Sequence, residues 1–227
     1  MKTSFLARTM RRRSFFQVAG ATVAASTLVL AGCKDTEVVQ PTTTNVLNLG
    51  SNDAGVLNYA YLLEQLEAAF YQKVLDTPPA DMPKEELALF TELRDHEVIH
   101  REYLKELLGA NAIPTVEFDF TSLTLTTRAG VLAAARTFED LGVAAYNGAG
   151  KLFTSKAFLV AAGKIASVEA RHAAFIHDLA QAPAFTGVVE TSGRYTGMAT
   201  ALTPLQVIEA AVKFFPFTVI TSGLPTA

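Results

Sequence analysis

The feature that most constrains this chain is a pattern of glutamate, tyrosine and histidine residues that occurs twice. Each copy has a Glu-x6-Tyr motif, and its glutamate lies 33 residues (first copy) or 30 residues (second copy) before a Glu-x-x-His motif. The motif residues are Glu64, Tyr71, Glu97 and His100 in the first copy, and Glu139, Tyr146, Glu169 and His172 in the second. This internal repeat predicts two similar helical hairpins in one chain.

All four motif glutamates fall on the apolar faces of predicted helices. Before Pro78, for example, the positions three and four apart are Leu57, Tyr61, Glu64 and Ala68. Burying one unpaired carboxylate costs several kcal/mol, so four of them would exceed the ~5–15 kcal/mol that stabilises a domain. No Lys or Arg lies on these faces. We therefore expect two divalent metal ions, which balance four carboxylates, with a neutral imidazole completing each ion's shell.

The spacing within each motif predicts a role for each ligand. Residues three apart share a helix face, so in Glu-x-x-His the glutamate can bridge both metals while the histidine binds one of them terminally. Glu64 and Glu139, upstream of these motifs, are then the terminal carboxylates.

Helical periodicity and capping signals predict four long helices and a short fifth one. Proline and glycine residues punctuate the chain at Pro78-Pro79, Pro83, Gly109 and Pro183. The predicted helices span residues 53–76, 83–108, 128–149 and 155–181, and the short one begins at Thr203-Pro204 and ends before Pro216.

The connections between these helices predict the topology. The joins within the first and second helix pairs are short, which favours antiparallel hairpins, whereas residues 109–127 are long enough to travel the length of a bundle. This connection also carries a strand-like alternation at Val116, Phe118 and Phe120. The predicted fold is all-α: a four-helix bundle of two antiparallel hairpins joined by a long crossover, plus a short C-terminal helix.

The strings LEQLEAAFY and FEDLGVAAYNGAG, with the doubled Glu-x-x-His, resemble the ferritin-like di-metal carboxylate superfamily, especially its exported, desiccation-related type. The resemblance covers the four long helices, about 130 residues. It implies a ferritin-like bundle with a di-iron or di-manganese centre that reacts with peroxide or dioxygen in oxidative or desiccation stress defence. The metal ligands that it implies are Glu64, Glu97, His100, Glu139, Glu169 and His172.

Several neighbours of these ligands remain open to two interpretations. Tyr71 and Tyr146 either pack in the core or hydrogen-bond a ligand carboxylate. Glu67 corresponds by pseudosymmetry to Gly142; it is either an extra ligand, as in some family members, or a solvated or salt-bridged glutamate, which we favour. Gly142 leaves space beside one metal. Two further histidines, His96 and His177, fall off the inward faces and are expected on the surface or in ordinary packing.

The N-terminus predicts export and lipid anchoring. Residues 1–33 combine basic residues with an apolar stretch too short for a comfortable membrane span. Arg12-Arg13 resembles a twin-arginine signal, which exports folded proteins, and the run ending at Cys33 resembles a lipobox; the alternative is an ordinary secretory signal. Residues 34–52 are expected to form a flexible tether to a domain at 53–181, followed by a C-terminal loop and short helix at 182–227. The expected location is the bacterial cell envelope, periplasmic or on the outer membrane.

Composition excludes some classes of protein and leaves others. Without the five bases of the leader, 14 basic residues face 22 acidic ones, so nucleic-acid binding is not expected. Cys33 is the only cysteine, which excludes an internal disulfide. The expected partners are a lipid membrane, through acylated Cys33, and a small oxidant or dioxygen. The alternatives to a di-metal oxidoreductase are a non-catalytic, metal-stabilised envelope or stress protein and a ferroxidase or iron-binding protein. Glu and His ligands do not distinguish iron from manganese.

Overall fold

A computed structural model of the protein describes residues 46–181, 187, 189–190, 192–194 and 196–226. The predicted signal segment 1–33, its Cys33, and the predicted tether up to residue 45 lie outside these residues.

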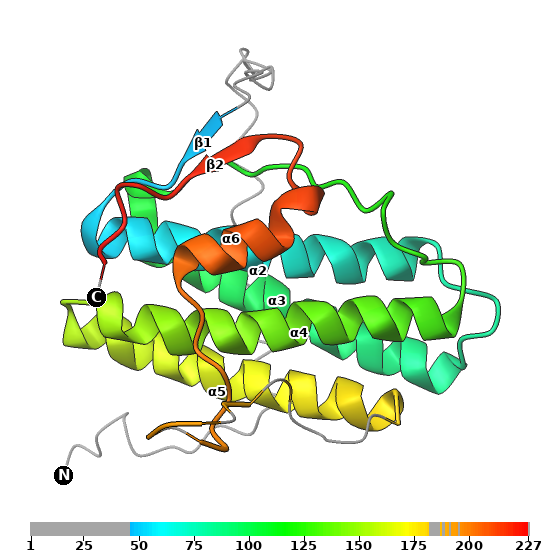
Figure 1. The fold of residues 1–227 in the computed structure, drawn as a ribbon. Coiled ribbons are helices and arrows are strands. Elements are labelled where there is room, and N and C mark those ends of the chain that lie inside the picture. The colour runs from blue at the N-terminus through cyan, green and yellow to red at the C-terminus, as the bar shows by residue number, and fades with distance from the viewer. Residues whose placement is uncertain (1–45, 182–186, 188, 191, 195, 227) are drawn as a thin grey trace, which may run out of the picture. The chain divides into compact units, whose positions relative to one another are not determined.

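Four long helices, antiparallel within each hairpin, form the bundle that the sequence predicts (Figure 1). They are α2 (Asn52–Asp76), α3 (Lys84–Leu108), α4 (Arg128–Ala149) and α5 (Lys156–Leu179). Helix α2 packs mainly against α3, and α4 packs mainly against α5, so each hairpin is a close pair. The two hairpins enclose one continuous apolar core. The prediction of a four-helix bundle of two antiparallel hairpins joined by a long crossover is confirmed.

The observed helix bounds lie within two residues of the predicted ones, and the differences occur at the helix ends. Helix α4 spans the predicted residues, whereas α3 begins after Pro83, whose backbone is extended (φ −61°, ψ 146°). Helix α5 begins one residue late because Ser155 is its N-cap: the Ser155 side chain accepts a hydrogen bond from the Phe158 backbone N–H. The same helix ends two residues early, and Gln181, with φ of 51°, lies outside it.

The crossover between the hairpins is extended but forms no strand, so the strand-like alternation at 116–120 is not β structure. Two buried amide side chains of α2 occupy the place of a neighbouring strand. Asn58 Oδ1 accepts from the Ile113 N–H at 2.9 Å, and Gln65 Oε1 accepts from the Val116 N–H at 3.0 Å. The alternation reflects one apolar face lying on the bundle, while these side chains satisfy two of the backbone N–H groups that a neighbouring strand would otherwise satisfy.

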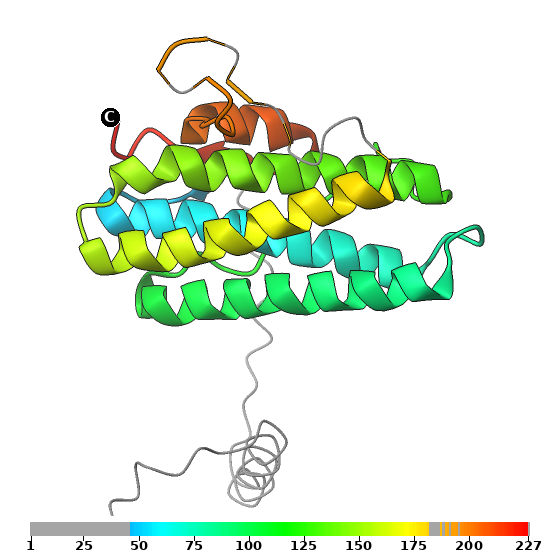
Figure 2. The same ribbon diagram turned by 90° about the horizontal axis from the view of Figure 1, so that it is seen from below.

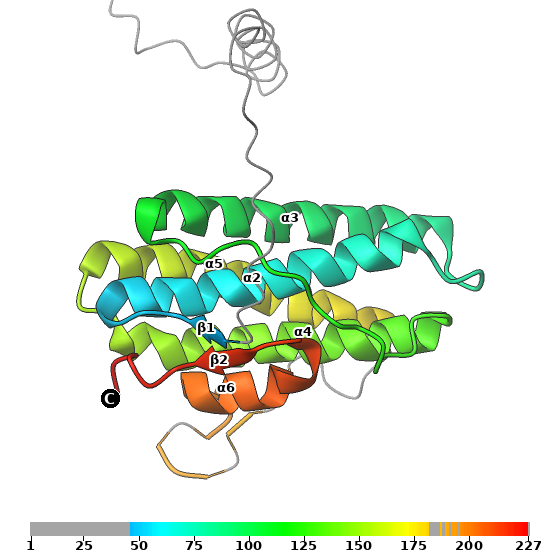
Figure 3. The same cartoon turned by 90° about the horizontal axis from the view of Figure 1, so that it is seen from above.

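A short strand pair lies in a stretch that the sequence predicts as tether. Strand β1 (Val46–Asn48) pairs in parallel with β2 (Thr218–Ile220), with Val46 opposite Thr218. Leu49, just after β1, is fully buried. Figure 3 shows the pair beside α6, and Figure 1 shows it above α2. Residues 46–48, which the sequence predicts as part of the tether, are therefore part of the folded structure, because β1 and β2 are joined by backbone hydrogen bonds.

The C-terminal segment packs on the outer side of α4. Helix α6 (Pro204–Ala211) opens with a capping box between Thr203 and Gln206 and continues into the 3-10 turn η4 (Val212–Phe214). Two further 3-10 turns, η2 (Gly109–Asn111) and η3 (Gly150–Leu152), follow α3 and α4. Gly148 allows this packing, since a Cβ there would lie 1.7 Å from the Leu202 carbonyl oxygen. Figure 2 shows α3 on the side of the bundle away from α6.

None of the helices in the described part of the chain is both long enough and apolar enough to cross a membrane.

Candidate metal centre

Six side chains converge in the middle of the bundle, and each long helix contributes at least one of them. They are Glu64 from α2, Glu97 and His100 from α3, Glu139 from α4, and Glu169 and His172 from α5. The four carboxylates are fully buried, and the two imidazoles are buried to within 8% exposure. The structure thus brings together all six residues that the repeat predicts as ligands.

The six residues form two overlapping groups. One contains Glu64, Glu97, His100 and Glu169, and the other contains Glu97, Glu139, Glu169 and His172; each has one ligand atom per residue within 4.8 Å of the rest. Glu97 and Glu169 belong to both groups. The glutamates expected to bridge therefore lie between the two positions, and the glutamates expected to be terminal, Glu64 and Glu139, lie at one position each.

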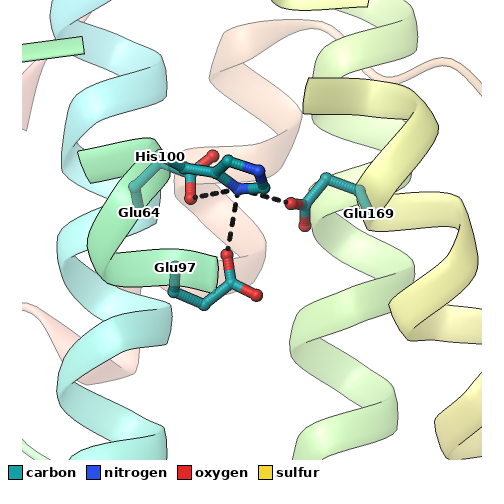
Figure 4. Close-up of side chains that lie close together, drawn as sticks. All are labelled: Glu64, Glu97, His100 and Glu169. Atoms are coloured by element: carbon teal, nitrogen blue, oxygen red, sulfur yellow. Dashed lines mark ion pairs between the residues drawn. The ribbon is translucent and has the colours of Figure 1, made fainter. Parts of the chain in front are cut away.

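The first position has the dimensions of a coordination shell (Figure 4). The Nδ1 atom of His100 lies 3.3 Å from Glu64 Oε2, 3.3 Å from Glu97 Oε2 and 3.1 Å from Glu169 Oε1. Ligand atoms ~2.1 Å from one metal are ~3.0 Å apart at right angles and ~3.4 Å apart at tetrahedral angles. The three separations from the histidine nitrogen fall between these values, so each of the three carboxylate oxygens can bind the same ion as His100 Nδ1.

The second position uses the other oxygen of the shared glutamate. The Nδ1 atom of His172 lies 2.7 Å from Glu97 Oε1 and 3.6 Å from Glu139 Oε2. The two oxygens of Glu97 thus face different histidines, as a bridging carboxylate requires. The ligand atoms of the second position are less evenly spaced than those of the first, with one short and one long separation.

Hydrogen bonding within the protein leaves the facing atoms unsatisfied. Nine buried side-chain oxygen and nitrogen atoms in the described residues lack a hydrogen-bond partner, and all but the Tyr59 hydroxyl belong to the six converging residues. Each such atom costs ~1–3 kcal/mol. No Lys or Arg is among the buried side chains of the described chain. Oxygen and imidazole nitrogen atoms in this arrangement fit divalent transition metals, which would supply both the missing bonds and the missing charge.

The pKa values show how the cluster carries charge without metal. Burial raises the pKa of Glu64 to about 7 and raises that of Glu169 well above its usual value. Burial alone would also raise the pKa of Glu97, but its two histidine neighbours lower it to about 2. Burial opposes the charged histidines, yet their carboxylate contacts raise the pKa of His100 to about 12 and that of His172 to about 11. Without metal, protons on the glutamates and histidines therefore neutralise the charge that metal ions would otherwise balance.

Two tyrosines tie the hairpins together at the terminal carboxylates. The Tyr71 hydroxyl on α2 donates to Glu139 Oε1 on α4, and the Tyr146 hydroxyl on α4 donates to Glu64 Oε1 on α2. Of the two interpretations left open by the sequence, the structure shows the hydrogen-bonded one. Each bond leaves Oε2 of its glutamate facing the cluster, so the tyrosines orient the carboxylates toward the metal positions.

Glu67 is buried, which corrects the expectation that it is solvated or salt-bridged. Its side chain is 3% exposed, and burial together with nearby carboxylates raises its pKa well above the usual range. A Cβ on Gly142 would lie 2.9 Å from Glu67 Oε1 and 3.0 Å from Glu169 Oε2. The space expected beside Gly142 is thus filled by a fifth carboxyl group, although Glu67 belongs to neither of the two ligand groups.

The two remaining histidines of the described chain have different surroundings. His177 is buried and its Nε2 contacts the Asp140 carboxylate at 2.9 and 3.1 Å, as expected of a packing histidine. His96 is exposed, as expected, but its Nδ1 lies 2.9 Å from His172 Nε2. Sequence reasoning missed this contact. The available signal was that His96 precedes His100 by one helical turn and so lies on a similar side of α3.

Comparison with known proteins agrees with the fold. The sequence profile of the ferritin-like domain matches residues 52–182, more than half of the chain and all four helices of the bundle. No protein with a curated description matches the chain. The matched region contains all six converging residues as well as both tyrosines. With this profile match and a four-helix bundle around a buried carboxylate and histidine cluster, the chain belongs to the ferritin-like domain family.

Proposed function

We propose that the protein binds two iron or manganese ions in this cluster and uses them for redox chemistry with peroxide or dioxygen. The observation that carries the proposal is the pair of overlapping ligand groups, in which two buried glutamates are common to both. Shared carboxylates hold two metals close enough to act on one small oxidant. Such a metal pair would supply two electrons, one from each ion, which together with two protons is what the reduction of H₂O₂ to two water molecules requires.

The protein's own contribution is to bind, orient and exclude water. Tyr71 and Tyr146 fix the terminal carboxylates by hydrogen bonds from the opposite hairpin. The surrounding core, with Phe70, Phe90 and Phe138 fully buried, keeps bulk water from the cluster. A reactive metal pair in such an enclosure is protected from side reactions with solvent.

Metal content tests the binding part of the proposal. Protein purified from its own compartment should hold about two transition metals per chain. Glu97→Gln and Glu169→Gln should each lower this content, because each removes a carboxylate common to both positions. Glu106→Gln, an exposed glutamate on the same helix as Glu97, is the matched control and should keep the wild-type content. Well under two metals per wild-type chain would refute the proposal.

Redox behaviour tests the chemical part separately. Peroxide added to Fe(II)- or Mn(II)-loaded protein should oxidise both ions, as followed by absorption and electron paramagnetic resonance. Bound metal that stays divalent would favour a non-catalytic, metal-stabilised envelope or stress protein. Continued uptake of Fe(II) well beyond two ions per chain would favour a ferroxidase that stores iron.

We also propose that the protein is exported and lipid-anchored through Cys33 on the outer face of a bacterial membrane. The support is the sequence alone: the twin-arginine-like string and the lipobox-like run ending at Cys33. Wild-type protein should partition with membranes and carry the mass of a lipid, whereas Cys33→Ser should be soluble. Wild-type protein that is already soluble would rule the anchor out. If export does use the twin-arginine route, the bundle can acquire its metals before it leaves the cytoplasm.

A further inference from the structure

One exposed histidine is joined to the buried cluster by a single hydrogen bond. His96 Nδ1 lies 2.9 Å from His172 Nε2, and the two rings are inclined by only 11°. The ring centroids are 5.1 Å apart, 2.2 Å more than the separation of the two nitrogens. This difference of 2.2 Å is about twice the distance from the centre of an imidazole to one of its nitrogens, as expected if both nitrogens lie on the line between the two centroids. The rings therefore meet edge to edge in nearly one plane, the geometry of a linear N–H···N bond.

This bond engages the nitrogen of His172 that carries the proton when a metal is bound. His172 faces the carboxylates through Nδ1, and a metal-binding nitrogen must be unprotonated. In a neutral imidazole the proton then sits on Nε2, which donates to Nδ1 of His96. An outer hydrogen bond of this kind orients a ligand histidine and makes its metal-binding nitrogen a better donor.

The other ligand histidine has no equivalent support. In the described part of the chain, His100 has only its carboxylate contacts at Nδ1 and a ring contact with His172. The internal repeat explains the difference. Glu97 corresponds to Glu169, so the position equivalent to His96 is Val168, whose side chain cannot accept a hydrogen bond.

We propose that His96 is a positioning residue that makes the two metal positions unequal. The position formed by His172 with Glu97, Glu139 and Glu169 fills first and binds more tightly than the position formed by His100. This inference rests on the proposed binding of two metals and adds their order. Outer hydrogen bonds to ligand histidines are worth ~10–100-fold in metal affinity. Because His96 is exposed, water can partly replace it, and we expect the lower end, about tenfold.

The order of filling is measured with Zn²⁺, a diamagnetic ion that binds the same oxygen and nitrogen ligands. Long-range ¹H–¹⁵N correlation spectra of the histidine rings report tautomer and metal binding residue by residue. At one Zn²⁺ per chain, the His172 Nδ1 signal should shift while that of His100 stays in place, and His172 should be the Nε2–H tautomer. Filling of the His100 position first, or of both positions together, would overturn the proposal.

Substitutions at the exposed position separate positioning from folding. His96→Leu removes the acceptor and should weaken the first binding step about tenfold, without a change in the unfolding temperature. His96→Asn should restore most of this loss, since Asn Oδ1 is attached to Cγ as Nδ1 is in histidine. Val168→Ala, at the repeat-equivalent position, is the matched control and should leave the first step unchanged. Equal affinities of the wild type and His96→Leu would refute the role, whereas absence of any Zn²⁺ binding would refute the metal site itself.

Discussion

Removing the metals should reverse the way the protein's stability depends on pH. Without metal, the buried cluster is neutralised by protons on glutamates whose pKa values are raised, among them Glu64 and Glu169. A carboxyl whose pKa is higher in the folded state contributes stability at low pH and loses it as the pH rises through the folded pKa. The metal-free bundle should therefore become less stable as the pH rises from weakly acidic to neutral. The metal-bound protein should show the opposite trend, because acid protonates its ligands and releases the ions.

The size of the effect follows from Glu64. Its pKa rises from 4.5 in the unfolded chain to about 7 in the fold, and the side chain is fully buried. At ~1.36 kcal/mol per pKa unit, this residue alone costs the metal-free protein ~3 kcal/mol between pH 4.5 and a pH above 7. In a domain of this size, ~3 kcal/mol corresponds to a fall of ~6–12 °C in melting temperature. Loss of the protons on His100 and His172 acts in the same direction but at higher pH, above 6.5 and toward their folded pKa values of about 12 and 11.

The assay is thermal unfolding by circular dichroism at pH 5 and pH 7.5, with protein stripped by a chelator or loaded with Mn²⁺. The melting temperature of the stripped protein should fall over this interval, and that of the loaded protein should rise or stay level. Glu64→Gln should flatten the curve of the stripped protein by ~3 kcal/mol, whereas the exposed Glu106→Gln should not alter it. A stripped wild type that becomes more stable from pH 5 to pH 7.5 would refute the reasoning, since the cluster would then not be held by protons.

Four further predictions test the cluster and its supports. Metal binding at pH 7 should release ~3 protons per chain, from the two ligand histidines and the protonated glutamates, as measured by calorimetry in buffers of different ionisation enthalpy; release of less than one would contradict the protonation states. Gly142→Ala should keep the fold but lower metal affinity, because its Cβ meets Glu67 Oε1 at 2.9 Å, and unchanged affinity would show that this carboxyl has room to move. Tyr71→Phe should weaken metal binding by ~tenfold through loss of the bond to Glu139, with little change in helix content. Asn58→Ala should cost ~3 kcal/mol in denaturant unfolding, at ~1 kcal/mol for each of three hydrogen bonds; a loss under ~1 kcal/mol would mean that water replaces the amide.

The helices could be predicted from the sequence because their signals are local. Apolar periodicity and punctuation by proline and glycine place α4 at its observed bounds and the other long helices within two residues of theirs. The extended crossover could not be classified in this way. Its alternation at 116–120 indicates one buried face, but whether a strand or a side chain satisfies the backbone depends on Asn58 and Gln65, which are far away in sequence. Local signals do not predict strand β1 either, because its partner β2 is far away in the sequence.

The site could be predicted as far as its repeat extends. Buried carboxylates on apolar helix faces need cations, and this argument requires only the sequence. The burial of Glu67 does not follow from this argument, because it depends on a residue of the facing helix. Gly142 has no side chain and so leaves room for the Glu67 carboxyl group. The role of His96 does not follow from it either, since its exposure was predicted correctly but its contact with His172 depends on how α3 and α5 approach each other.

The departures from the repeat carry information that the repeat itself does not. Four carboxylates, two imidazoles and two tyrosines occur in matched pairs, and a fully symmetric centre would treat both metals alike. Two departures beside the cluster, Glu67 facing Gly142 and His96 at the position equivalent to Val168, each contribute a polar group from the first hairpin. A proton-bearing carboxyl and a hydrogen-bond acceptor are thus present on one half of the cluster only. We therefore expect metal binding to depend on these unmatched residues as well as on the matched ones.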